Sequence, residues 1–189
     1  MKYFKKLVGD RIYLSPRNAE DVETFVKWLN DFEVTDYTGR SSALMDVDAE
    51  KEYLATKKNN VMPFVIVKLE NDEMIGTIGF DKIDYTNKVA TLGIMIGEKE
   101  NREKGYGTEA INLLLDYGFN YLNLNSVNLD VMEFNERGIA CYKKCGFKEM
   151  GRRRKNVFVN GKYYDKLFMD ILKEEFDERG KSYIRNKNI

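Results

Sequence analysis

Residues 102–110 read Arg-Glu-Lys-Gly-Tyr-Gly-Thr-Glu-Ala, and this segment carries the chemistry of the 189-residue chain. It follows an apolar, strand-like run at residues 89–96 and opens a helical pattern at residues 105–121. Glycines let a backbone come close to a phosphate, and the free N–H groups at a helix N-terminus bind one. The segment therefore indicates a phosphate-bearing ligand, unless its two glycines only ease a turn.

This glycine loop, residues 102–108, has three interpretations. Its GxGxxA pattern fits a dinucleotide fingerprint, with Asp130 near the end of the next strand as the ribose-binding acid. Against this, residues 97–104 separate the strand from the first glycine, where a dinucleotide motif has a tight turn. The other two interpretations are a turn without a ligand and a pyrophosphate loop for a different cofactor. A Walker GxxxxGK[ST] sequence is absent, so a P-loop nucleotidase is not supported.

The segments around the loop alternate between strand and helix patterns, which predicts a mixed α/β fold. In chain order we expect a strand (11–14), two helices (18–29 and 46–58) flanking a loop (31–45), three strands (63–69, 74–80 and 89–96), a helix (105–121), a strand (127–132), a helix (135–145) and two strands (150–159 and 163–172). In this βααβββαβαββ order, a right-handed crossover makes strands 89–96 and 127–132 parallel. No linker interrupts the chain, so we expect one domain over residues 1–189, with its core at about 11–176 and a fraying tail at 179–189.

Composition excludes several classes of function. The chain has 31 Lys and Arg residues against 31 Asp and Glu residues, a balance that disfavours a nucleic-acid binder. It has no histidine, which removes His-based metal sites and His-activated Ser or Cys nucleophiles, so no metal site is expected. Cys141 and Cys145 are interpreted as small packing residues. The sequence contains neither a signal peptide nor a membrane-spanning apolar run, so a cytoplasmic location is expected.

Residues 135–147, Asn-Glu-Arg-Gly-Ile-Ala-Cys-Tyr-Lys-Lys-Cys-Gly-Phe, decide between the interpretations of the glycine loop. Together with the loop they resemble the GNAT superfamily of N-acetyltransferases, over about residues 11–176. The resemblance rests on two motifs in register, Arg102-x-x-Gly105-x-Gly107 and Asn135-x-x-x-x-Ala140-x-Tyr142-x-x-x-Gly146-Phe147. Residues 117–119, 122–124 and 159–163 look like the branch that contains acetyltransferases of ribosomal-protein N-termini and of spermidine.

The resemblance implies a GNAT-like mixed sheet and an acetyl-CoA site. In this family the two central parallel strands splay apart and the pantetheine arm lies between them. Here these are residues 89–96 and 127–132, with Gly93 where a bulge would help the splay. Backbone groups of residues 94–96 would polarise the thioester carbonyl, and residues 102–108 would hold the pyrophosphate. The cofactor-binding residues implied are Ile94, Met95, Ile96, Arg102, Glu103, Lys104, Gly105, Tyr106, Gly107, Thr108, Asn135 and Tyr142.

The resemblance also implies catalytic roles. Tyr142 matches the position that protonates the leaving thiolate as a general acid. Many relatives have a glutamate base two residues before the position of Gly93, but Thr91 stands there and cannot deprotonate an ammonium. Glu33 and Asp36, in the loop after the first helix, are alternative base candidates, as is water. Glu103 replaces the glycine of many relatives, and its carboxylate would repel a pyrophosphate unless it points away.

The charge distribution bears on the acceptor and the partners. Residues 1–100 contain 14 basic and 18 acidic residues, and residues 101–189 contain 17 and 13. This split favours a cationic acceptor, a polyamine or a protein N-terminus, beside an anionic cofactor. The basic run at 152–155 is either a solvated strand edge or a contact to phosphates or RNA.

We therefore expect an acetyl-CoA-dependent N-acetyltransferase that moves the acetyl group directly to a primary amine on a small molecule or peptide. No specific nucleic acid, membrane or metal partner is expected, and a homodimer is a family-level expectation. The alternatives are a non-catalytic module on the same fold that senses acyl-CoA or binds a protein, and a nucleotide-binding redox domain.

Overall fold

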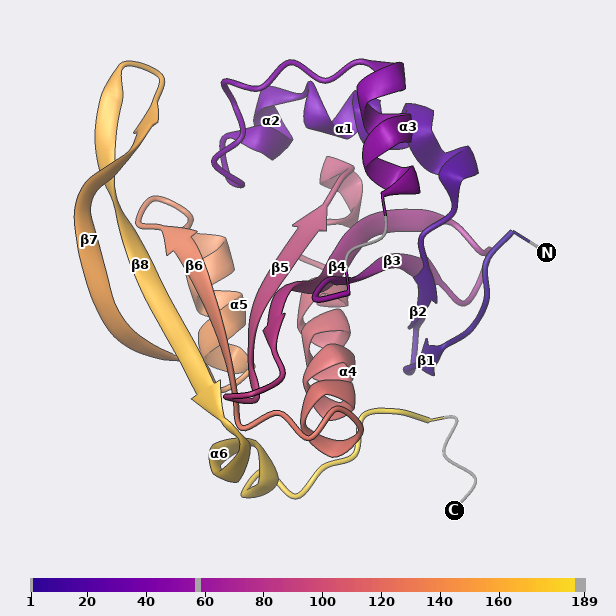
Figure 1. Ribbon diagram of the computed structural model, residues 1–189, viewed down its shortest axis with the longest axis vertical. Coiled ribbons are helices and arrows are strands. Elements are labelled where there is room, and N and C mark those ends of the chain that lie inside the picture. The colour runs from indigo at the N-terminus through magenta and orange to yellow at the C-terminus, as the bar shows by residue number, and fades with distance from the viewer. Residues whose placement is uncertain (1, 57–58, 186–189) are drawn as a thin grey trace.

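The computed structural model describes residues 2–56 and 59–185 (Figure 1). Its strands form one mixed sheet in the order β1-β2-β3-β4-β5-β6-β8-β7. The strands are β1 (Leu7–Val8), β2 (Ile12–Pro16), β3 (Met62–Lys68), β4 (Met74–Asp84), β5 (Val89–Ile96), β6 (Ser126–Met132), β7 (Lys148–Val159) and β8 (Lys162–Leu172). The helices are α1 (Val22–Leu29), α2 (Phe32–Thr35), α3 (Val47–Ala55), α4 (Tyr106–Asn120), α5 (Glu136–Lys144) and α6 (Lys173–Asp177), with 3-10 turns at Ala19–Asp21 and Lys99–Asn101. None of these helices combines the length and apolarity needed to cross a bilayer.

Helices cover both faces of the sheet, and the strands alternate to match. In β3, Phe64 and Ile66 belong to the large core that includes α4, whereas Val65 and Val67 belong to the smaller core that includes α1. All four side chains are buried. Successive strand residues point to opposite faces, so a run that is apolar at every position indicates a strand covered on both sides.

The parallel strands β5 and β6 separate after a short contact, which confirms the predicted splay. Their register extends only from the pair Val89–Ser126 to the pair Thr91–Asn128. At this last pair the Thr91 hydroxyl donates a hydrogen bond of 2.9 Å to Asn128 Oδ1. Beyond it, β5 pairs with β4 and β6 pairs with β8, so the two strands diverge (Figure 1). We call this divergence the fork.

The irregularity beside the fork lies in β4, and not at Gly93 as we expected. The register between β4 and β5 shifts between Phe80 and Lys82, which leaves Asp81 as an extra, bulged residue. A β-carbon at Gly93 would lie 2.3 Å from Asp81 Oδ2. Gly93 therefore leaves room for the carboxylate of Asp81 and does not itself bulge.

The predicted helices and strands all occur, and the structure adds β1, α2 and α6. Helix α2 is one short turn that begins after Asp31, whose carboxylate accepts the N–H of Glu33 over 2.9 Å. Such a turn is too short for an apolar period, so the predicted loop at 31–45 was wrong there. The helix predicted at 46–58 ends at Ala55, and residues 57–58 lie outside the described residues.

The C-terminal segment contacts α4 where we expected a fraying tail. The buried Asp116 carboxylate accepts the backbone N–H groups of Tyr183 and Ile184 over 2.7 and 3.2 Å. Arg185 adds an ion pair of 2.8 Å with Asp10. Residues 183–185 therefore have partners, and residues 186–189 lie outside the described residues.

Candidate active site

Two cavities adjoin at the fork. The first, which we call the α1 cavity, has a volume of about 360 Å³ and lies beneath α1 and α3. The second, the α4 cavity, also has a volume of about 360 Å³ and lies at the N-terminal ends of α4 and α5. The side chains that line both cavities are Tyr37, Thr38, Ile94, Met95 and Tyr142. Volumes of this size suit small-molecule ligands.

The α4 cavity combines an uncapped helix N-terminus with an open strand edge. Gly105 is the N-cap residue of α4 at φ +83°, a left-handed conformation that favours glycine, and its helix has no side-chain cap. Residues 94–96 of β5 have no strand partner on the side of β6. Helix N-terminal N–H groups bind anions, and a free strand edge can hydrogen-bond an extended ligand. The cavity therefore fits a long ligand with a phosphate at one end and amide groups along its arm, which is the chemistry of CoA.

Ten of the twelve predicted cofactor-binding residues line the α4 cavity, and two do not. The lining residues are Ile94, Met95, Ile96, Arg102, Glu103, Gly105, Gly107, Thr108, Asn135 and Tyr142. The carbonyl of Lys104 instead accepts a hydrogen bond of 2.8 Å from Arg11 Nη1. The ring of Tyr106 lies 4.9 Å from the guanidinium carbon of Arg11. Arg11 therefore anchors the glycine loop through Lys104 and Tyr106.

Arg102 and Glu103 both interact with other protein groups. Arg102 Nη2 donates to the Gly97 carbonyl over 2.7 Å, and Nη1 donates to the Glu33 carbonyl over 3.3 Å. Its side chain thus braces the glycine loop against α2. Glu103 has φ +61° and forms an ion pair of 3.2 Å with Arg137 Nη1 on α5. Arg137 therefore offsets the negative charge that Glu103 brings to the cavity.

Helix α5 and its N-cap residue contribute to both cavities: Tyr142 lines both of them, and Asn135 lines the α4 cavity. Burial raises the pKa of Tyr142, and the nearby groups of Cys141 and Asp130 raise it further. The phenol is therefore protonated at neutral pH, as it is in an ordinary tyrosine, and has a proton to donate. Asn135 Oδ1 caps α5 by accepting the Gly138 N–H over 3.0 Å. Its amide NH₂ is the part of the side chain left to contact a ligand.

The two predicted base candidates lie away from the α1 cavity. Glu33 lines the α4 cavity, 3.8 Å from Lys99 Nζ and 4.0 Å from Arg102 Nη1. Asp36 accepts a hydrogen bond of 2.5 Å from the Ser41 hydroxyl. Neither carboxylate is among the residues that line the α1 cavity. Helix α2 instead carries Glu33 towards the glycine loop.

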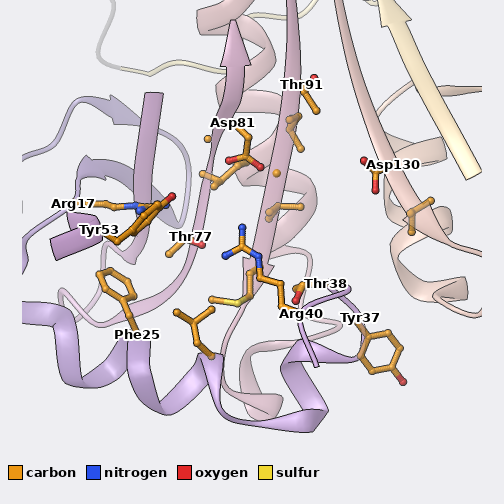
Figure 2. A pocket seen from close by; sticks show the side chains of 18 of the residues that line it. Arg17, Phe25, Tyr37, Thr38, Arg40, Tyr53, Thr77, Asp81, Thr91 and Asp130 are labelled. Carbon is orange, nitrogen blue, oxygen red and sulfur yellow. The ribbon is translucent and has the colours of Figure 1, made fainter. Parts of the chain in front are cut away.

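Four of the five charged side chains that line the α1 cavity were missed from the sequence, the fifth being Asp130. Arg17, Arg40, Glu50 and Asp81 line it, from four separate segments. Figure 2 shows the Arg40 guanidinium extending into the cavity, with Asp81 and Asp130 on either side of β5. Burial raises the pKa of Asp81 and of Glu50, while Arg17 and Arg40 oppose the rise. As a whole residue Asp81 is nevertheless exposed to solvent, and it lines the α1 cavity.

The two cysteines have different surroundings. Both are free thiols; Cys145 is buried, whereas Cys141 lines the α4 cavity. Cys141 Sγ lies 3.3 Å from Thr108 Oγ1. Hydrogen bonds from Cys145 and Thr108 lower the pKa of the Cys141 thiol, and the same coupling raises the pKa of Cys145. The packing interpretation thus describes Cys145, while Cys141 also faces a cavity.

The family model and the sequence relatives that match this chain are all acetyltransferases. The acetyltransferase (GNAT) domain family matches residues 11–148. An uncharacterized N-acetyltransferase of Bacillus licheniformis, p20, is 30% identical over 175 residues, which cover 90% of this chain and 97% of that protein. A spermidine N(1)-acetyltransferase of Vibrio cholerae is 33% identical over 114 residues, which cover 60% and 65% of the two chains.

A solved structure agrees with the sequence relatives. The crystal structure of spermidine N-acetyltransferase from Vibrio cholerae, in complex with CoA and spermine, has a TM-score of 0.81 and 27% identity to this chain. The match covers 87% of this chain and 97% of that one. This chain therefore belongs to the GNAT family of N-acetyltransferases, as its two motifs predicted.

Proposed function

We propose that this chain transfers the acetyl group of acetyl-CoA directly to a primary amine bound in the α1 cavity. The observation that carries the proposal is that the α1 and α4 cavities adjoin at the fork and share Tyr142. A thioester reached from the α4 cavity and an amine held in the α1 cavity would meet at that side chain. The Vibrio relative was solved in complex with both CoA and spermine, which supports binding of a CoA thioester and an amine by this fold.

Four parts of the protein have separate roles in the proposed reaction. Acetyl-CoA supplies the activated acetyl thioester. The open edge of β5 at residues 94–96 binds and polarises its carbonyl, and the N-terminus of α4 holds its phosphates. Asp81 attracts the acceptor ammonium and takes its proton. The amine nitrogen then bonds to the acetyl carbon, the carbon–sulfur bond breaks, and Tyr142 donates its proton to the leaving sulfur. The second proton lost by the acylated nitrogen restores the Tyr142 hydroxyl.

Calorimetric titration with acetyl-CoA, followed by a thiol-release assay over a panel of primary amines, tests the proposal. We expect acetyl-CoA to bind, NAD not to bind, and one released thiol for each N-acetylated product found by mass spectrometry. Binding of NAD in place of acetyl-CoA would indicate a redox domain. Acetyl-CoA binding without transfer to any amine would indicate a non-catalytic module, and either result would contradict the proposal.

Glu103→Gln should tighten acetyl-CoA binding by about two- to fivefold at low salt, because it removes a carboxylate from the glycine loop and frees Arg137. The gain should shrink as salt rises, since both charges are exposed. Calorimetry at two ionic strengths measures this effect. Glu100→Gln is the matched control, because Glu100 is exposed and lines neither cavity. Weaker binding by the Glu103 variant would mean that the Glu103–Arg137 pair shapes the loop.

A further inference from the structure

We infer that the α1 cavity takes an amine that also carries a carboxylate, an amino acid or a close derivative of one, and not a polyamine. The inference rests on the proposed function, in which this cavity holds the acceptor. It names a class of acceptor different from the spermine and spermidine in the names of the Vibrio relatives. The argument depends on four charged side chains that the fold brings together from distant parts of the chain.

The first observation concerns two arginines that lie near carboxylates but form no ion pair with them among the described residues. Arg17 lies between two aromatic rings, with its guanidinium carbon 6.0 Å from the Phe25 centroid and 5.6 Å from the Tyr53 centroid. Its Nε is buried, and no described residue hydrogen-bonds to it. Arg40 extends into the cavity from the other side (Figure 2). Among the described residues, neither arginine forms an ion pair within 4.0 Å. A buried donor without a partner is costly, so a ligand acceptor is the natural complement.

The second observation concerns the carboxylates that face these arginines. Glu50 is only 3% exposed, and Asp81 lies beside Gly93 at the fork. Neither forms a salt bridge among the described residues. A third carboxylate, Asp130, is paired with Lys166 over 2.9 Å. The cavity lining thus holds two cations and three anions. Because Lys166 neutralises Asp130, two charges of each sign remain that form no ion pair among the described residues.

This charge balance discriminates between classes of acceptor. A polyamine carries several positive charges and needs an excess of carboxylates, and Arg17 and Arg40 would repel it. An amino acid carries one charge of each sign. Its ammonium fits Asp81, nearest the fork, and its carboxylate fits the planar guanidinium of Arg40, which binds carboxylates in a bidentate manner. The excess of acidic residues over positions 1–100 therefore does not extend into the cavity.

Matched pairs of acceptors test the inference: lysine against cadaverine, ornithine against putrescine, and phenylalanine against phenethylamine, with spermidine as the polyamine reference. Within each pair the amine is retained and only the carboxylate is lost. We expect kcat/KM for acetylation to be about ten- to a hundredfold higher for the acid-bearing member of at least one pair. Calorimetry of the same compounds, with the protein alone and with desulfo-CoA, should show the same order of binding.

Arg40→Gln should lower this preference by about tenfold or more, because it removes the charge that binds the carboxylate. Arg40 is exposed, so its substitution does not threaten the fold. Arg154→Gln is the matched control, an exposed arginine on β7 that lines neither cavity. Equal or better use of the decarboxylated amines or of spermidine, or an unchanged preference in the Arg40 variant, would overturn the inference.

The same experiments separate this inference from the proposed function. Transfer to polyamines alone would overturn the inference and leave the proposed acetyltransferase intact. Failure of acetyl-CoA to bind would overturn the proposed function. Amino acid binding that Arg40→Gln weakens would still support the assignment of the α1 cavity in that case, because calorimetry of the protein alone does not depend on acetyl-CoA.

Discussion

Tyr142→Phe should lower kcat by about 10²- to 10⁴-fold, the range for loss of a general acid, while the dissociation constant for acetyl-CoA changes little. The substitution keeps the ring that lies 6.1 Å from Phe147 and removes only the hydroxyl. Without that proton donor, the sulfur must leave as an unprotonated thiolate. Its surroundings disfavour an anion, since burial there raises the pKa of the Tyr142 phenol. Steady-state kinetics together with calorimetry separate the loss of turnover from a loss of binding.

Tyr121→Phe is the matched control for this prediction. Tyr121 is half exposed after α4 and lines neither cavity, so removal of its hydroxyl should leave turnover intact. A Tyr142 variant with wild-type kcat would mean that water protonates the sulfur. A variant that loses acetyl-CoA binding in proportion to activity would mean that the hydroxyl holds the cosubstrate and does not act as an acid.

Asp81→Asn should lower kcat/KM by about 10²- to 10⁴-fold at neutral pH, because the amide cannot accept the proton of the acceptor ammonium. The activity of the wild-type protein should fall as the pH drops through the pKa of Asp81, which burial places above the usual range of an aspartate. The variant should not show this fall at the pKa of Asp81. Its rate should instead rise with pH as the acceptor ammonium gives way to the free amine. A pH profile of kcat/KM for both proteins measures the difference.

Stability measurements provide the control for unfolding in the Asp81 variant. A carboxyl whose pKa is raised by folding stabilises the protein below its unfolded pKa, and that contribution is lost as the pH rises through the folded pKa. At neutral pH the ionised Asp81 therefore costs stability, and Asp81→Asn should not lower Tm. Asp48→Asn, at a side chain that is 96% exposed, is the matched surface variant. A larger loss of activity in Glu33→Gln or Asp36→Asn than in Asp81→Asn would overturn the assignment of the base.

The difference between the base candidates predicted from the sequence and the carboxylate that lines the α1 cavity illustrates what a sequence pattern can locate. The apolar run at 74–80 ends at Phe80, so Asp81 reads as the first polar residue after a strand. In the structure β4 continues to Asp84 and bulges at Asp81, which aims this carboxylate at Gly93. For Glu33 the difference runs the other way, because the sequence pattern places it in a loop near the expected acceptor. The short helix α2 turns it towards Arg102 and Lys99.

The motifs and the strand and helix periods were sufficient to predict the family, the order of the elements, the parallel pair β5–β6 and the position of Tyr142. These features depend on residues close together in the chain, or on the fixed spacing between the glycine loop and α5. The α1 cavity brings together Arg17, Arg40, Glu50 and Asp81, which lie on four segments with no shared period. Their mutual distances follow from the packing of α1 and α3 on the sheet and from one bulged residue in β4. The charges of the α1 cavity therefore became visible only in the folded chain, because the sequence records which charges exist but not which of them face one another.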